Sequence, residues 1–110
     1  MRRYISVGGV VKPLVVTLCG SVKFKQAFWD ANFNETMAGK IVLSVGGLEH
    51  DDHFDLTEED KRMLGDLHKR KIDMSDEILV LNVGGYIGKS TEGEIEYARQ
   101  HGKGVRFLEE

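Results

Sequence analysis

The chain contains a single proline and a single cysteine among its 110 residues. One cysteine excludes an internal disulfide and a cysteine-rich zinc site. No apolar run approaches the roughly 20 residues of a membrane-spanning helix, so no membrane contact is expected. The start of the chain, Met1–Gly9, carries two arginines but lacks the apolar stretch and cleavage signal of a secretory leader. We therefore expect a cytoplasmic protein.

Neither sign of charge dominates, because 15 basic and 18 acidic residues leave a net charge of -3. Nucleic-acid-binding domains usually present a basic surface to the phosphates, so no nucleic-acid partner is expected. Hydrophobic residues make up 41% of the chain, which suits a folded core rather than a disordered segment. The length fits one domain. We place that domain at residues 14–110, after an N-terminal extension of residues 1–13.

Short apolar runs alternate with amphipathic segments along the domain. The runs predict strands and the segments between them predict helices, with strands at 14–18, 41–45, 78–82 and 105–108 and helices at about 24–38, 57–74 and 91–101. Thr57 and Asp60 are spaced as in a capping box. Such alternation is typical of a parallel α/β sheet with right-handed crossovers. We predict a small doubly wound, flavodoxin-like or Rossmann-like fold with strand order 2-1-3-4.

Two loops, at residues 19–23 and 83–91, contain glycines and hydroxyl residues, and each follows a predicted strand. In such a sheet, ligands bind beyond the carboxyl ends of the strands where the strand order reverses. Helix N-termini there offer free N–H groups to anions. Glycines and hydroxyls serve tight turns and helix caps equally well, but two such loops at one switch point favour an anion or nucleotide site. The expected binding residues are Cys19, Gly20, Ser21, Lys23, Gly85, Tyr86, Gly88, Ser90 and Thr91.

Known phosphate-binding and metal-binding patterns are incomplete in this sequence. Gly88-Lys89-Ser90 matches the end of a P-loop, but Val83 stands where its first glycine belongs. An NTPase is therefore disfavoured, and no cofactor is expected. The run His50–His53 contains metal-ligand residue types, yet consecutive loop residues rarely converge on one ion, so no metal is expected either.

The residues after the third predicted strand also carry a carboxylate of interest. Glu94 lies in the first turn of the last predicted helix, where the helix dipole favours its ionised form. An ionised carboxylate at a ligand site can act as a nucleophile. The alternative is that Glu94 only stabilises the helix, which is common for an acidic residue at this position.

The order and spacing of these motifs resemble the nucleoside 2-deoxyribosyltransferase superfamily, which includes nucleoside 5'-monophosphate N-glycosidases. The similarity runs from about Leu14 to Leu108. Its most specific part is Glu-x-x-Tyr-Ala followed by Gly-Lys, after a third strand that opens with an aspartate. The matching residues are Cys19-Gly20-Ser21, Asp76, Gly85-Tyr86-Ile87-Gly88, Ser90-Thr91, Glu94, Tyr97-Ala98 and Gly102-Lys103.

The resemblance implies the same fold and assigns roles to individual residues. Glu94 matches the family's catalytic nucleophile, and Ser21 and Ser90 match serines that hold the 5'-phosphate in the nucleotide-hydrolysing branch. Lys23 stands where that branch has arginine, which keeps the charge but loses bidentate geometry. His68 replaces an aspartate that contacts the leaving base. An imidazole titrates near neutrality and can protonate a base, but His68 also fits a surface histidine in the basic, solvated run 68–71.

We therefore expect an enzyme that cleaves an N-glycosidic bond of a nucleoside or its 5'-monophosphate. Glu94 would attack the anomeric carbon and the glycosyl group would pass to water or to a second base, as in a retaining glycosidase. The alternative is a non-catalytic nucleotide-binding or sensing module, because a fold does not determine function.

We also expect a homo-oligomer, since related proteins complete their sites with a neighbouring subunit and Trp29 and Phe33 lie off the apolar stripe of their helix.

Overall fold

The computed structural model describes residues 6–7, 10–46 and 55–110. A parallel four-stranded sheet has the spatial order β4 (Ile41–Leu43), β3 (Val15–Cys19), β5 (Glu77–Val80) and β6 (Gly104–Phe107). In chain order these strands run 2-1-3-4, so the predicted α/β class and topology are confirmed. Before the sheet, β1 (Ser6–Val7) pairs antiparallel with β2 (Val10–Val11), which the sequence did not predict.

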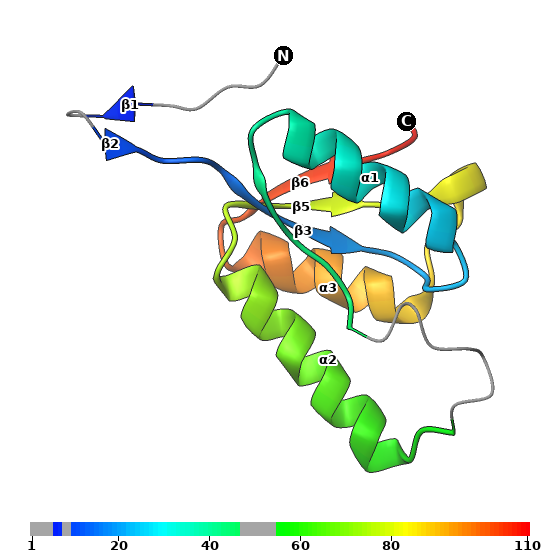
Figure 1. The fold of residues 1–110 in the computed structure, drawn as a ribbon. Helices are drawn as coiled ribbons and strands as arrows, with labels where there is room; N and C mark the ends of the chain where they lie inside the picture. Colours follow the sequence, from blue (N-terminus) through cyan, green and yellow to red (C-terminus); the bar gives the residue numbers. More distant parts are fainter. Residues whose placement is uncertain (1–5, 8–9, 47–54) are drawn as a thin grey trace.

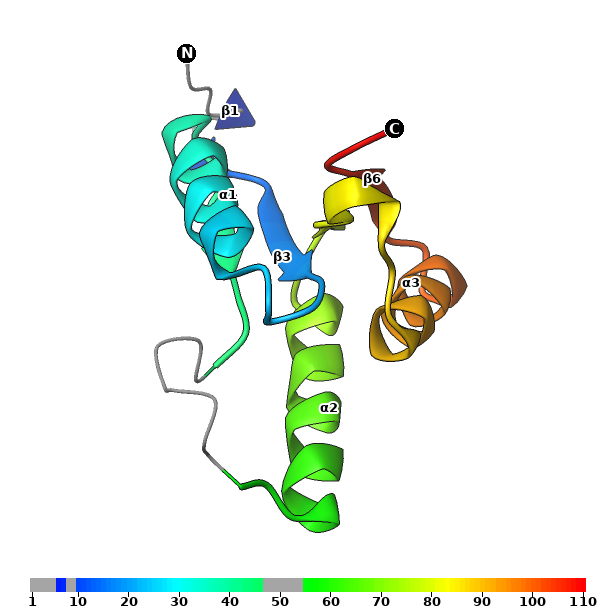
Figure 2. The ribbon, with the colours of Figure 1, turned by 90° about the vertical axis from the view of Figure 1, so that its right-hand side faces the viewer.

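Helices cover both faces of the sheet (Figure 1). The helical segments are α1 (Lys25–Met37), α2 (Glu58–Asp73), α3 (Lys89–Gln100) and the short 3-10 helix η1 (Val83–Gly85). Figure 2 shows α1 on one side of the sheet and α2 and α3 on the other, with α2 extending well past the strands. Among the described helices, none is long and apolar enough to span a membrane.

Strand β3 lies inside the sheet and alternates its side chains between two cores. Val16 and Leu18 pack with Phe28 and Ala31 of α1 and with the facing residues of β5. Cys19 belongs to the other core, together with Ile72 of α2, Ile95 and Ala98 of α3, and Ile78 and Val80 of β5. The two-residue period of a strand produces this division. It also explains why the predicted strands read as continuous apolar runs.

The helix ends follow from local sequence signals. Thr57 Oγ1 accepts a hydrogen bond from Asp60 N at 3.0 Å, and Asp60 Oδ2 accepts one from Thr57 N at 3.0 Å, which confirms the capping box. Gly39 and Gly102 follow the ends of α1 and α3 with φ angles of 91° and 71°, which glycine adopts most easily. Helix α3 begins at Lys89, two residues before the predicted start.

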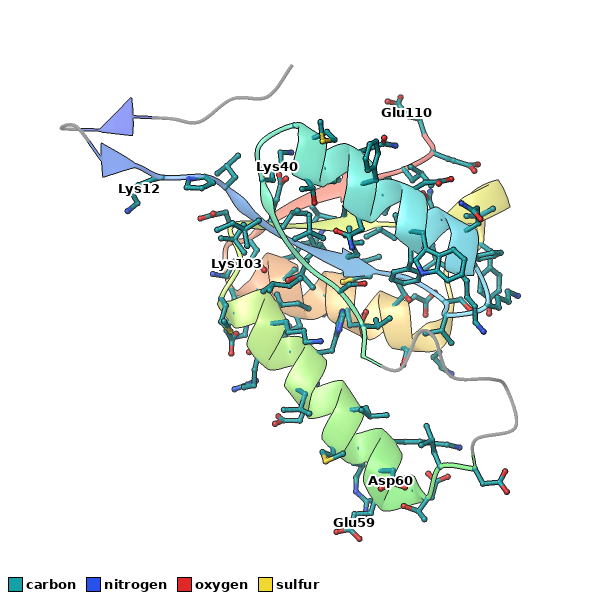
Figure 3. All side chains as sticks on the ribbon, viewed as in Figure 1. Lys12, Lys40, Glu59, Asp60, Lys103 and Glu110 are labelled. Carbon is teal, nitrogen blue, oxygen red and sulfur yellow. The ribbon has the colours of Figure 1, made fainter. Side chains whose placement is uncertain are left out.

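An ion-pair network joins α1, the start of β4, and the strands β5 and β6. Arg106 Nη2 lies 2.8 Å from Glu77 Oε2 and 2.6 Å from Glu35 Oε1. Lys40 Nζ lies 3.1 Å from each of the same two carboxylates, near the amino ends of the strands (Figure 3). Burial raises the pKa of Glu77, but the hydrogen bonds and charges of Arg106 and Lys40 outweigh burial and bring it below the ordinary 4.5.

Replacing Glu77 with Gln should lower the free energy of unfolding by about 1–2 kcal/mol at pH 7. The folded-state pKa of Glu77 is lowered, so its contribution is present above pH 4.5 and is lost as the pH falls through the folded-state value. Urea unfolding at neutral pH and at about pH 3 measures both effects.

Glu58→Gln is the matched control, because the pair between Glu58 and Lys61 is exposed. It should change the free energy of unfolding by less than about 0.5 kcal/mol. A Glu77→Gln loss of equal size at both pH values would contradict the assigned role of the charge.

Candidate functional site

A cleft of about 760 Å³ lies at the carboxyl ends of the strands, where the order reverses between β3 and β5. Its walls come from the residues after β3, β4 and β5, from one side of α2 and from the start of α3. Eight of the sequence-predicted residues line it: Gly20, Ser21, His68, Tyr86, Gly88, Ser90, Thr91 and Glu94. Cys19, Lys23 and Gly85 are not among its lining residues. The structure thus brings most of the predicted site together.

The loop after β3 is held close to the end of β5. A Cβ atom on Gly20 would lie 3.2 Å from Leu81 Cβ and 3.3 Å from Leu81 O, so a side chain there would require Leu81 to move by a few tenths of an ångström. The Ser21 carbonyl accepts a hydrogen bond from Phe24 N at 3.0 Å, which closes the turn into α1. This turn places Ser21 at the cleft.

The loop after β5 is anchored to the C-terminal residues. Asn82 Nδ2 donates to Glu109 O at 2.8 Å, and Glu109 N donates to Asn82 Oδ1 at 2.9 Å. The Glu109 carboxylate accepts the N–H of Gly84 at 3.1 Å. Gly84 and Gly85 have φ angles of 63° and 83°, so this tight turn requires glycine. The anchored turn sets the position of the residues that follow, up to the start of α3.

Lys23 lies against Tyr86 rather than in the cleft. Its Nζ is 4.0 Å from the centroid of the Tyr86 ring and 5.3 Å from that of Phe24. A cation over an aromatic face is stabilised by the ring quadrupole. Because Tyr86 itself lines the cleft, Lys23 lies behind one of the walls.

Three titratable side chains meet at the carboxyl end of β3. Cys19 Sγ at the end of β3 is 3.4 Å from His68 Nε2 on α2, and that nitrogen is 3.8 Å from Glu94 Oε1 on α3. Cys19 is fully buried and His68 is 7% exposed. His68 is therefore not the surface histidine of the alternative interpretation, because α2 directs it towards the core.

Burial determines the protonation of this group. It raises the pKa of Glu94 to about 7, and the hydrogen bond with Cys19 and the charge of Lys69 offset it only in part. It lowers the pKa of His68 to about 4, with the charge of Lys71 acting in the same direction and a hydrogen bond to the Leu18 backbone opposing it. Burial also raises the pKa of the Cys19 thiol, and the neighbouring Glu94 adds to this effect.

The expectation that the helix dipole keeps Glu94 ionised is wrong, and the start of α3 gives the reason. Since the helix begins at Lys89, Glu94 lies in its second turn and Glu92 is the acidic residue of the first. The dipole effect fades beyond the first turn. At pH 7 a substantial fraction of Glu94 is therefore protonated, and His68 is neutral.

Helix α2 adds residues to the cleft that the sequence interpretation missed. Lys61, Arg70 and Lys71 line it, and Lys89 joins them from α3. The run Lys69–Lys71 was expected to be a solvated face. The available signal was the helical spacing of Lys61, Leu64, His68 and Lys71, which places them on one side. Leu64, Leu67 and Met74 are at least 40% exposed and supply an apolar wall.

The run His50–His53 lies outside the described residues, so its expected lack of a metal stays a prediction.

Comparison with known proteins adds no further assignment. The chain matches no protein-family model, no curated protein and no solved structure.

Proposed function

We propose that the protein cleaves the N-glycosidic bond of a nucleoside 5'-monophosphate, with Glu94 as the nucleophile. One observation carries the proposal: the Glu94 carboxylate faces a cleft at the switch point that Ser21 and Ser90 also line. Ser90 lies in the first turn of α3, whose N–H groups are free to bind an anion. This arrangement supports a phosphate near the helix start and a sugar one turn further along, beside Glu94.

The reaction follows from these positions. Ionised Glu94 attacks the anomeric carbon, the carbon–nitrogen bond breaks, and its electron pair leaves with the base, which takes up a proton from solvent. Water or a second base then attacks the anomeric carbon of the glycosyl ester, the bond to the Glu94 oxygen breaks, the acceptor loses a proton to solvent, and ionised Glu94 is regenerated. The exposed apolar side chains Leu64 and Leu67 of α2 offer a surface for the planar base.

The role of His68 as proton donor to the leaving base stays a prediction. A pKa of about 4 leaves the ring neutral at pH 7, and a neutral imidazole is a weak acid. Its Nε2 lies 3.8 Å from Glu94 Oε1. His68 therefore also fits a residue that positions the nucleophile.

Basic side chains around the cleft support an anionic substrate. Lys61, Lys71 and Lys89 line it together with Arg70, which pairs with Asp73, and Glu94 is the carboxylate among the lining residues. A cleft with an excess of one sign of charge concentrates ligands of the opposite sign. The chain as a whole is acidic, with a net charge of -3, so the local excess of cations is a property of this cleft.

A non-catalytic nucleotide-binding module is the second candidate, and the protonation of Glu94 favours it. A carboxyl group with a pKa of about 7 is partly neutral at physiological pH, and the neutral form is not a nucleophile. The two candidates differ in whether free base appears when the protein meets a panel of nucleosides and monophosphates.

Glu94→Gln should reduce base release by about 10³-fold or more, because the amide cannot form the glycosyl ester. Mass spectrometry of the released base gives the rate, and circular dichroism and calorimetric ligand binding show that the fold and cleft persist. Glu92→Gln is the matched control on the same helix and should retain the wild-type rate. Turnover of Glu94→Gln near the wild-type rate would refute the nucleophile, and ligand binding by a wild type that releases no base would establish the second candidate.

The wild type should prefer a monophosphate over its nucleoside, and Lys89→Met, which removes a cleft-lining ammonium at the start of α3, should lose most of that preference. A hydrogen bond to a charged group contributes about 1.5–3 kcal/mol, which corresponds to roughly 10- to 150-fold in kcat/KM. Lys12→Met is the control, since Lys12 is exposed and precedes β3 at the opposite end of the strand (Figure 3). Equal use of both substrates by the wild type would exclude a phosphate site.

We also propose a homo-oligomer, held together through α1. Trp29, Phe33 and Met37 recur every four residues and are 47%, 65% and 55% exposed, so they form an apolar stripe on one side of the helix. Light scattering at micromolar concentration should give at least twice 12.4 kDa. Phe33→Lys should shift the mass towards the monomer, whereas Asn34→Lys on the same helix should not. A wild-type mass near 12.4 kDa would refute the proposal.

A further inference from the structure

We infer that Cys19, His68 and Glu94 together bind one Zn²⁺ ion. Their ligand atoms, the Cys19 Sγ, the His68 Nε2 and a carboxylate oxygen of Glu94, all lie within 4.8 Å of one another. They come from three different elements, β3, α2 and α3, so the fold rather than a local motif brings them together. The sequence interpretation considered only the run His50–His53 as a metal site and expected no metal; Cys19, His68 and Glu94 are far apart along the chain and were not considered together.

The distances suit a tetrahedral ion. Zinc bonds of about 2.0–2.3 Å to sulfur, nitrogen and oxygen place neighbouring ligand atoms roughly 3.3–3.7 Å apart. The Sγ–Nε2 distance is 3.4 Å and the Nε2–Oε1 distance is 3.8 Å. The third pair, Cys19 Sγ and a carboxylate oxygen of Glu94, lies within 4.8 Å.

The chemistry of the three groups selects the metal. A thiolate and an imidazole prefer zinc and other borderline or soft ions over Mg²⁺ and Ca²⁺, which need mostly oxygen ligands. On binding, the Cys19 S–H bond breaks, its proton leaves to solvent and a sulfur–zinc bond forms. His68 and Glu94 line the cleft whereas Cys19 is buried behind them. The fourth position therefore faces the cleft and takes water, as in three-ligand zinc sites.

Nearby cations are directed elsewhere. The Lys71 ammonium donates a hydrogen bond to the Ser44 carbonyl. The Lys69 ammonium is 5.6 Å from the centroid of the Tyr97 ring. Each ammonium thus has a partner outside the three ligands, although the charge of Lys71 still lowers the pKa of His68 and that of Lys69 the pKa of Glu94.

A bound ion changes what Glu94 can do. Its ligating oxygen is no longer free to attack a sugar, so Zn²⁺ should inhibit base release. This consequence rests on the proposed function, whereas the binding of zinc does not. Measuring metal binding in the absence of nucleotide therefore separates the two proposals.

The test uses chelator-treated full-length protein. Equilibrium dialysis should give one Zn²⁺ per chain. Co²⁺, as a spectroscopic probe, should give a thiolate charge-transfer band and the intense visible absorption of a tetrahedral site, both removed by added Zn²⁺. Absence of these bands in the wild type, with no Zn²⁺ retained, would overturn the inference whatever any variant does.

Variants identify the ligands. Cys19→Ser should abolish the charge-transfer band, and His68→Gln and Glu94→Gln should each weaken zinc binding by at least about 10-fold. Circular dichroism confirms that each variant is folded. The controls are His101→Ala, an exposed histidine just after α3, and the double change His50→Ala and His53→Ala. Both should bind zinc like the wild type, and loss of zinc in the double variant would place the ion elsewhere and refute the site.

Discussion

The parallel arrangement of four strands is the constraint on which the rest of the structure depends. Because β4, β3, β5 and β6 run in one direction, their carboxyl ends meet at one edge of the sheet. The chain leaves β3 towards α1 on one face of the sheet and leaves β5 towards α3 on the other face. The cleft lies between these two connections. Cys19, Ser21 and Glu94 lie near one another because β3 and β5 are neighbours, although they are up to 75 residues apart in the chain.

Two carboxylates, one at each end of the sheet, show how context sets charge. Glu77 near the amino ends accepts hydrogen bonds from Arg106 and Lys40, and its pKa falls despite partial burial. Glu94 near the carboxyl ends faces a thiol and a neutral imidazole, and burial raises its pKa to about 7. The first carboxylate stabilises the fold through its charge. The second has a pKa shifted by burial, which is typical of groups at functional sites.

Glu94 serves both proposals, with different partners in each. A nucleotide would meet Glu94 from the cleft, with its phosphate towards Ser90 and the start of α3. A zinc ion would meet Glu94 from the side of Cys19 and His68. The two occupants compete for one carboxylate, so the metal would act as an inhibitor of the proposed reaction. Their binding experiments remain independent, since the phosphate contacts and the thiol belong to different parts of the site.

The sequence by itself determined the features that depend on neighbouring residues. Strand and helix periodicity predicted the α/β class and the order 2-1-3-4, and the spacing of Thr57 and Asp60 predicted a capping box. The positions of the two glycine-containing loops placed the cleft-lining residues Ser21 and Ser90, because loop position follows from strand position. Only the tertiary structure decided which side of α2 is buried. That packing turned His68 inward from a run of basic residues, brought it to Cys19 and Glu94, and left Lys71 on the cleft. It also decided the protonation of Glu94, because a pKa depends on burial and on partners that are distant in the chain.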